Sequence, residues 1–265
     1  MNPNLRILSA IAAATLLESR RTHFPLLMGL LTLSGLGLSL FASTLAITES
    51  ATIGAMTLGG FLRLAAILAM ALFVLTSQAR EQQDKGMAQL LSLESPRAIY
   101  LFGKMVGYLW IHLAIVTLLT GLMLLFAAPL PALGWGISLL CEMTLISTLA
   151  LLCQLSFHNV PIGFATVSAF YLLARSVTAL RLVAGGPIMP DSATSVMLMS
   201  SILDGLAFLL PDLERFTRSA WLIQERAIEM TAQLPDALGF VLVQTLLYTA
   251  LLAAAALLDL YRKSV

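Results

Sequence analysis

The chain has 265 residues, of which 59% are hydrophobic and 11% are charged, and its mean hydropathy is +0.92. A water-soluble domain cannot expose so much apolar surface, so the composition excludes a soluble globular protein and predicts an integral membrane protein. A formal net charge of +1, from so few charged residues, is not in itself informative about partners, and we expect no nucleic acid among them.

The amino-terminal segment, Asn4 to Thr22, precedes the first long apolar run. Its side chains Leu5, Leu8, Ala12 and Leu16 fall on one helical stripe, which predicts a helix lying along the cytoplasmic membrane surface. The alternative is that this segment only lengthens the first span. Charged residues interrupt its apolar positions, so it does not resemble a removable signal and we expect it in the mature protein.

About 20 consecutive apolar residues cross a bilayer as a helix, so a chain of this length has room for about six spans. We therefore expect one all-α membrane domain covering residues 1–265. Continuous hydropathy predicts the spans at Phe24 to Ile47, Leu58 to Gln78, Tyr100 to Ala128, Trp135 to Phe157, Ile162 to Val183 and Leu238 to Leu260.

Basic residues cluster before the first span, between the second and third spans, and after the last span. The two short connections on the other side contain no Lys or Arg, which predicts that both termini are cytoplasmic. The long connection 184–236 is then extracytoplasmic, although it contains three arginines that acidic residues accompany. Within it we expect a re-entrant or interfacial helix at 192–210 and an amphipathic helix from Asp212.

The most polar passage in the first half of the chain runs from Arg80 to Lys104 and reads REQQDKGMAQLLSLESPRAIYLFGK. Glu81 and Lys85 have the spacing and order that favour an ion pair on a helix. Gly86 breaks or bends the backbone, and Pro96 ends the short helix that follows. Leucines exposed on a polar stalk indicate a binding partner, and the alternative is a solvated loop that contains leucines.

This passage resembles the cytoplasmic signature of ABC-2-type transporter permeases, the membrane subunits of one class of ATP-binding-cassette exporters. In that family an acidic residue near the end of the second span precedes a glycine, a leucine pair, a proline-basic turn and a Gly-Lys pair. The family commonly has Thr after the glycine, where this chain has Met87. The residues that match this order are Glu81, Gly86, Leu90, Leu91, Pro96, Arg97, Gly103 and Lys104.

The expected topology also resembles that family, which has an interfacial amino-terminal helix, six spans and paired extracytoplasmic helices before the last span. The passage LLPDLERF, Leu209 to Phe216, is similar to a Leu-Pro-acidic-Phe passage of many members. The resemblance implies that residues 79–99 form a coupling-helix loop, whose short helix docks into a separate cytosolic ATPase. It further implies two ATPase subunits under two permease copies, or under this chain and a related one.

The resemblance implies export of a lipid, glycan, peptide or drug-like molecule across the bacterial inner membrane, and membrane lipids as further partners. The chain cannot hydrolyse ATP itself, because a phosphate-binding loop reads Gly-x-x-x-x-Gly-Lys-Ser/Thr. Its Gly103-Lys104 pair has Ala98 at the first glycine position and Met105 in place of the hydroxyl residue. We expect no cofactor or metal in this chain, since ATP and Mg would bind to the partner ATPase.

Charged residues within spans are candidates for function, because each costs about 2.5 to 3.5 kcal/mol on insertion scales. Arg63, Glu142 and Arg175 fall in the outer halves of three spans, and Glu142 is predicted to pair with Arg175 or Arg63. Together they either line the translocation path or lock the bundle, with the lock favoured. His112 in the third span is either a proton relay or, in the favoured interpretation, a hydrogen-bonded packing residue.

Three other classes of protein compete with the exporter. An ion- or proton-coupled secondary transporter needs a proton or sodium site in the spans, for which Glu142 and His112 are the candidates. An intramembrane enzyme is disfavoured, because the spans contain no carboxylate pair, His-Glu-x-x-His motif or Ser/His arrangement at catalytic spacing. A non-transporting assembly protein is the third alternative.

Overall fold

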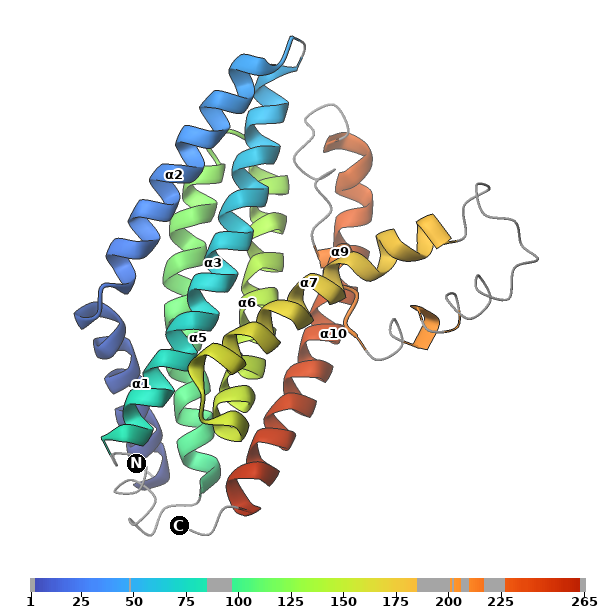
Figure 1. Cartoon of the computed structure of the whole chain (residues 1–265). Helices are drawn as coiled ribbons and strands as arrows, with labels where there is room; N and C mark the ends of the chain where they lie inside the picture. The colour runs from blue at the N-terminus through green and yellow to red at the C-terminus, as the bar shows by residue number, and fades with distance from the viewer. Residues whose placement is uncertain are drawn as a thin grey trace.

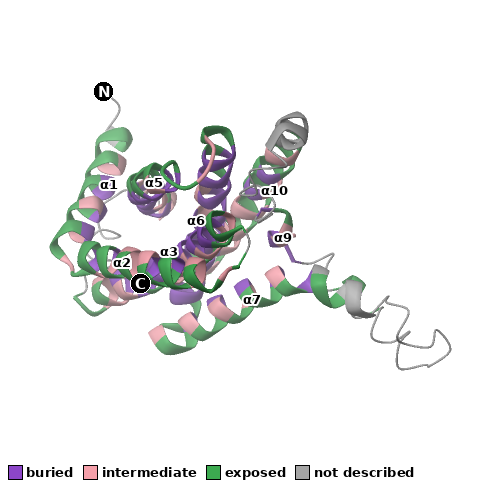
Figure 2. Cartoon of the chain, turned by 90° about the horizontal axis from the view of Figure 1, so that it is seen from above, coloured by how far each residue is buried: buried purple, intermediate pink, exposed green. Residues whose placement is uncertain are grey.

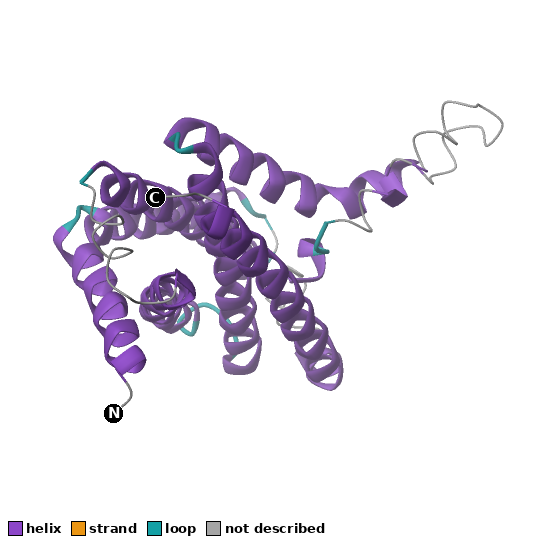
Figure 3. Cartoon of the chain, turned by 90° about the horizontal axis from the view of Figure 1, so that it is seen from below, coloured by secondary structure: helices purple, strands orange, loops and turns teal. Residues whose placement is uncertain are grey.

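The computed structural model describes residues 3–47, 49–84, 97–184, 201, 203–205, 210–216 and 227–262. These residues form helices, turns and loops, and no strand occurs among them (Figure 3). The helices are α1 (Pro3–Arg21), α2 (Phe24–Leu45), α3 (Ser50–Gln83), α5 (Arg97–Met123), α6 (Pro129–Phe157), α7 (Val160–Ala184), α9 (Leu213–Phe216) and α10 (Ala227–Arg262).

Within the described ranges, six helices are long and apolar enough to cross a membrane, namely α2, α3, α5, α6, α7 and α10. This confirms the predicted all-α architecture of a multi-pass membrane protein. The start of α1 and the end of α10 lie at the same end of the bundle, which we call the terminal end (Figure 1). The α2–α3 connection lies at the opposite end.

The centre of the bundle is formed by α3 and α6. In their most apolar windows 67% and 78% of the residues are buried, compared with 22% in both α2 and α10. Figure 2 shows the buried residues gathered on α3 and α6, with exposed faces on α2 and α7 outside them. Polar side chains on the buried faces of α3 and α6 are therefore enclosed by protein and need partners within it.

The second span begins earlier than predicted, at Ser50 instead of Leu58. The glycine-containing stretch before Leu58 was expected to be a loop but is helical. It lies against α2, because Ser39 Oγ donates a hydrogen bond of 2.7 Å to the carbonyl of Gly54. A Cβ at Gly54 would be 3.3 Å from Ser39 Oγ, so the glycine serves close helix packing.

The fourth span also begins before its predicted start at Trp135. Pro129 stands in the first turn of α6, where a proline is tolerated because that turn leaves its N–H groups without helical partners. At the other end His158 has a φ of 53° and ends the helix. Asn159 Oδ1 then accepts a hydrogen bond of 3.1 Å from the N–H of Ile162, which caps α7.

The predicted extracytoplasmic connection 184–236 ends where the apolar span of the last helix begins, at Asp236. Residues 227–236 belong to α10 and do not form part of a separate helix before the last span. The hydropathy signal begins only after Pro235, but a membrane helix tolerates a proline. The helix expected from Asp212 is described only as the single turn α9, and most of the expected helix at 192–210 lies outside the described residues.

The amino-terminal segment forms a helix of its own. The chain bends at Thr22 and His23 between α1 and α2, so residues 4–22 do not simply lengthen the first span. The buried face of α1 packs against α5 through Ile11 and its neighbours. Of the predicted apolar stripe, Ala12 is buried in the protein and Leu5 is 54% exposed.

Candidate functional site

Some of the predicted coupling residues lie within the segment 85–96, and the others lie on either side of it. Those within it lie outside the described residues and are Lys85, Gly86, Leu90, Leu91 and Pro96. Those beside it lie at the end of α3 and in the first turns of α5 and are Glu81, Arg97, Gly103 and Lys104. Both flanks are at the terminal end of the bundle (Figure 1).

An ion pair joins the two flanks. Lys104 Nζ lies 2.6 Å from Glu81 Oε2, and the two side chains are only 7% and 16% exposed. The sequence spacing favoured Lys85 as the partner of Glu81. Lys85 lies outside the described residues, and the pair with Lys104 links α3 to α5 across the segment 85–96.

Further polar side chains surround this pair. Gln78 Nε2 donates a hydrogen bond of 3.1 Å to Tyr108 Oη, and Tyr100 Oη donates one of 3.0 Å to Gln78 Oε1. Tyr100, Lys104 and Tyr108 are four residues apart, so they share one face of α5. We call Gln78, Glu81, Tyr100, Lys104 and Tyr108 together the Lys104 cluster.

Two glycines bring α1 into direct contact with this region of α5. A Cβ at Gly103 would lie 3.0 Å from Ile11 Cβ, and a Cβ at Gly107 would lie 2.7 Å from Thr15 Cβ. The four-residue spacing of the glycines places both under the same face of α1. Gly103, which belongs to the family-like motif, therefore has a packing role in this structure.

Residues near the ends of α3 and α5, beside the segment 85–96, also contact α1 and α10. Ser77 Oγ on α3 donates a hydrogen bond of 2.7 Å to Glu18 Oε2 on α1. Arg97 Nη1 donates one of 2.6 Å to the carbonyl of Leu260, and its guanidinium lies 5.8 Å from the ring centroid of Tyr261. A cation at the last carbonyls of a helix is favourable, because these carbonyls are the negative end of the helix dipole.

A second polar group lies in the interior, nearer the opposite end of α3. Arg63 Nη1 is 2.6 Å from Glu142 Oε2, and the two side chains are 1% and 0% exposed. Arg63 also donates hydrogen bonds to Ser138 Oγ at 3.0 Å and to the carbonyl of Trp135 at 3.2 Å. Arg175 Nη1 is 4.0 Å from Glu142 Oε1. The predicted pairing of Glu142 is confirmed, and Arg63 is the closer partner.

These five residues, which we call the Glu142 cluster, connect α3, α6, α7 and α9. Ser138 Oγ donates a hydrogen bond to the carbonyl of Phe216 in α9. Arg175, 33% exposed, donates one of 3.2 Å to Tyr171 Oη. Arg63 Nε and Glu142 Oε1 have no hydrogen-bond partner among the described residues. The cluster can therefore lock the bundle and still accept another polar group, so its role stays a prediction.

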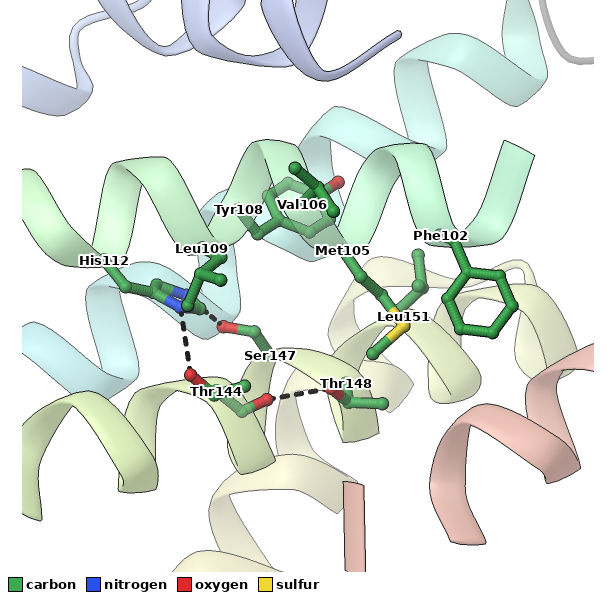
Figure 4. Close-up of a pocket in the computed structure, with 10 residues that line it drawn as sticks. All are labelled: Phe102, Met105, Val106, Tyr108, Leu109, His112, Thr144, Ser147, Thr148 and Leu151. Atoms are coloured by element: carbon green, nitrogen blue, oxygen red, sulfur yellow. Dashed lines mark hydrogen bonds between the residues drawn. The ribbon is translucent and has the colours of Figure 1, made fainter. Parts of the chain in front are cut away.

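His112 borders a cavity of about 210 Å³ between α5 and α6 (Figure 4). Its Nε2 is 2.9 Å from Ser147 Oγ, and its Nδ1 is 3.5 Å from Thr144 Oγ1. Within the described chain these ring contacts are to hydroxyl groups and not to a carboxylate. They support the interpretation of His112 as a hydrogen-bonded packing residue.

The sequence analysis missed several members of these groups. Tyr100 and Tyr108 flank Lys104 at helical spacing, and Gln78 and Glu81 are three residues apart on α3. This regular spacing marks a polar face at the end of each helix, which a search for continuous hydropathy does not detect. The contact between α1 and α3 has no such local signal.

Comparison with protein-family models and with curated proteins found no match to this chain. The fold and the two clusters define a multi-pass helical membrane protein with a polar face at its terminal end.

Proposed function

We propose that this chain is the permease subunit of an ABC-2-type exporter in the bacterial inner membrane, with the terminal end of the bundle in the cytoplasm. Two cytosolic ATPase subunits bind ATP and Mg, and their closure drives a pair of permeases to move a lipid, glycan, peptide or drug-like molecule outward. The side chains of the permease perform no covalent chemistry.

The observation that carries this proposal is the attachment of both flanks of the segment 85–96 to the bundle. Glu81 before the segment and Lys104 after it are 2.6 Å apart, and Arg97 binds the carboxyl end of α10. A displacement of the segment would act on α3, α5 and α10 together, because buried ion pairs and packed helices resist independent movement. This is the mechanical requirement for a helix that receives force from an ATPase.

The contacts of Glu142 and His112 favour the exporter over a proton-coupled transporter. Glu142 is paired with Arg63 at 2.6 Å, and His112 lies against the hydroxyl of Ser147 at 2.9 Å. A proton site needs a group that gains and loses charge during transport. Both candidate side chains already have partners inside the bundle, which suits a structural role.

Leu91→Asp tests this proposal, since it places a charge on the predicted docking face. The tagged parent chain is expected to copurify with a cytosolic ATPase that carries a phosphate-binding loop, and Leu91→Asp should insert in the membrane normally but lose that ATPase. Leu5→Asp is the matched control, because Leu5 is an exposed leucine on α1. Full retention of the ATPase by Leu91→Asp would contradict the proposal.

A further inference from the structure

A lateral groove of about 680 Å³ lies between α2, α3 and the carboxyl end of α1. Phe73 and Ala69 of α3 are buried at its inner wall, whereas Leu26 and Leu30 of α2 are 66% and 58% exposed. The part of the groove between these four residues is thus apolar, and it reaches the outer face of the bundle, where lipid surrounds a membrane protein.

One end of the groove is basic. Arg21, His23 and Arg80 line it, and the two arginines are exposed. Neither arginine side chain has a hydrogen-bond or ion-pair partner in the described part of the chain. The only carboxylate of the lining is Glu18, and its Oε2 already accepts the hydrogen bond from Ser77.

The basic end and the apolar walls of the groove are spaced like the headgroup and the acyl chains of a phospholipid. Arg80 stands in the last turns of α3 at the terminal end, and Ala69 lies about 16 Å deeper along the same helix at 1.5 Å per residue. Leu30 lies about 9 Å from Phe24 along α2 by the same rise. An anion at the rim would be level with lipid headgroups, and the apolar walls would be level with acyl chains.

We propose that this groove binds one anionic phospholipid, with its phosphate between Arg21 and Arg80 and an acyl chain along α2 and α3. A guanidinium binds phosphate through two parallel hydrogen bonds, and unpaired cations at a membrane surface attract anionic lipids. A free phosphate would leave the apolar walls uncovered, so the groove fits the whole lipid better than its headgroup. This site is independent of the molecule that the chain transports.

Native mass spectrometry of the full-length chain in detergent tests the site. Phosphatidylglycerol and phosphatidylcholine with identical acyl chains are the two probes. The parent chain should bind phosphatidylglycerol at least about tenfold more tightly, and the Arg21→Gln/Arg80→Gln double variant should reduce this preference to less than about twofold. Arg20→Gln is the matched control, because Arg20 is an exposed neighbour that does not line the groove.

Two further measurements separate a lipid site from other occupants. Leu72→Trp narrows the apolar wall and should weaken the binding of both lipids. Millimolar inorganic phosphate should not displace bound phosphatidylglycerol. An unchanged lipid preference in the double variant, an equal loss in Arg20→Gln, or displacement by phosphate would overturn the assignment. Cross-linking of two copies through Leu26→Cys would also overturn it, because the groove would then be an interface between chains.

Discussion

Glu142→Gln is the substitution that tests the interior of the bundle most sharply. It keeps the size of the side chain but removes the negative charge 2.6 Å from Arg63, whose side chain is 1% exposed. Removing one partner of a buried ion pair costs about 3 to 5 kcal/mol, because the other charge stays buried without compensation. The glutamine can still accept a hydrogen bond from Arg63, so we expect the lower value, about 3 kcal/mol.

The free energy of unfolding can be measured by titration with sodium dodecyl sulfate in mixed micelles, with circular dichroism reporting helicity. Glu49→Gln is the matched control, because Glu49 is exposed in the α2–α3 connection. It should change the free energy by less than about 0.5 kcal/mol. The Arg63→Met/Glu142→Met double variant removes both charges and should recover most of the stability lost in Glu142→Gln.

Two results would refute this reasoning. One is a Glu142→Gln chain within about 1 kcal/mol of the parent, which would mean that the ion pair does not lock the bundle. The other is a double variant less stable than Glu142→Gln. Normal folded yield together with altered transport in Glu142→Gln would favour a role in the translocation path over the lock.

Three other substitutions test contacts at the terminal end by the same titration. Gly107→Ala brings a methyl group to 2.7 Å from Thr15 Cβ and should lower the free energy of unfolding by about 1 to 3 kcal/mol. Gly121→Ala on the same helix is the control, because the added methyl group meets open space and should not destabilise the chain. Arg97→Gln removes a cation from the carbonyl end of α10 and should cost about 1 kcal/mol; no loss would mean that this contact is not stabilising. Lys104→Met leaves its carboxylate partner on α3 unpaired and should cost about 3 kcal/mol, and a cost below about 0.5 kcal/mol would show that the pair does not hold α3 to α5.

Hydropathy predicted the six helices because a membrane helix must keep a continuous apolar run. It misplaced the starts of α3 and α10, because the first turns of these helices do not depend on a continuous apolar run. The first turns of α3 from Ser50 were expected as part of a connection but are helical, and Gly54 lets α2 and α3 pack closely there. The first turns of α10 continue past Pro235, which a local scan for apolar runs does not anticipate.

The Glu142 pairing was predictable because a buried carboxylate needs a cation, and only two arginines were expected at a similar depth. The choice of Arg63 over Arg175 depends on how α3 and α7 pack around α6, which no local pattern encodes. Lys104 was predicted only as a motif residue. Its ion pair with Glu81 joins two helices separated by the segment 85–96, so it could be found only from the three-dimensional arrangement.

The central claim is our proposal that the segment between α3 and α5 receives force from a separate ATPase subunit. The most direct measurement is transport by the purified chain in vesicles, with and without the cytosolic ATPase that we expect to copurify with it. We predict ATP-dependent transport only when both are present. Transport by the chain alone, driven by an ion gradient and insensitive to ATP, would contradict the claim.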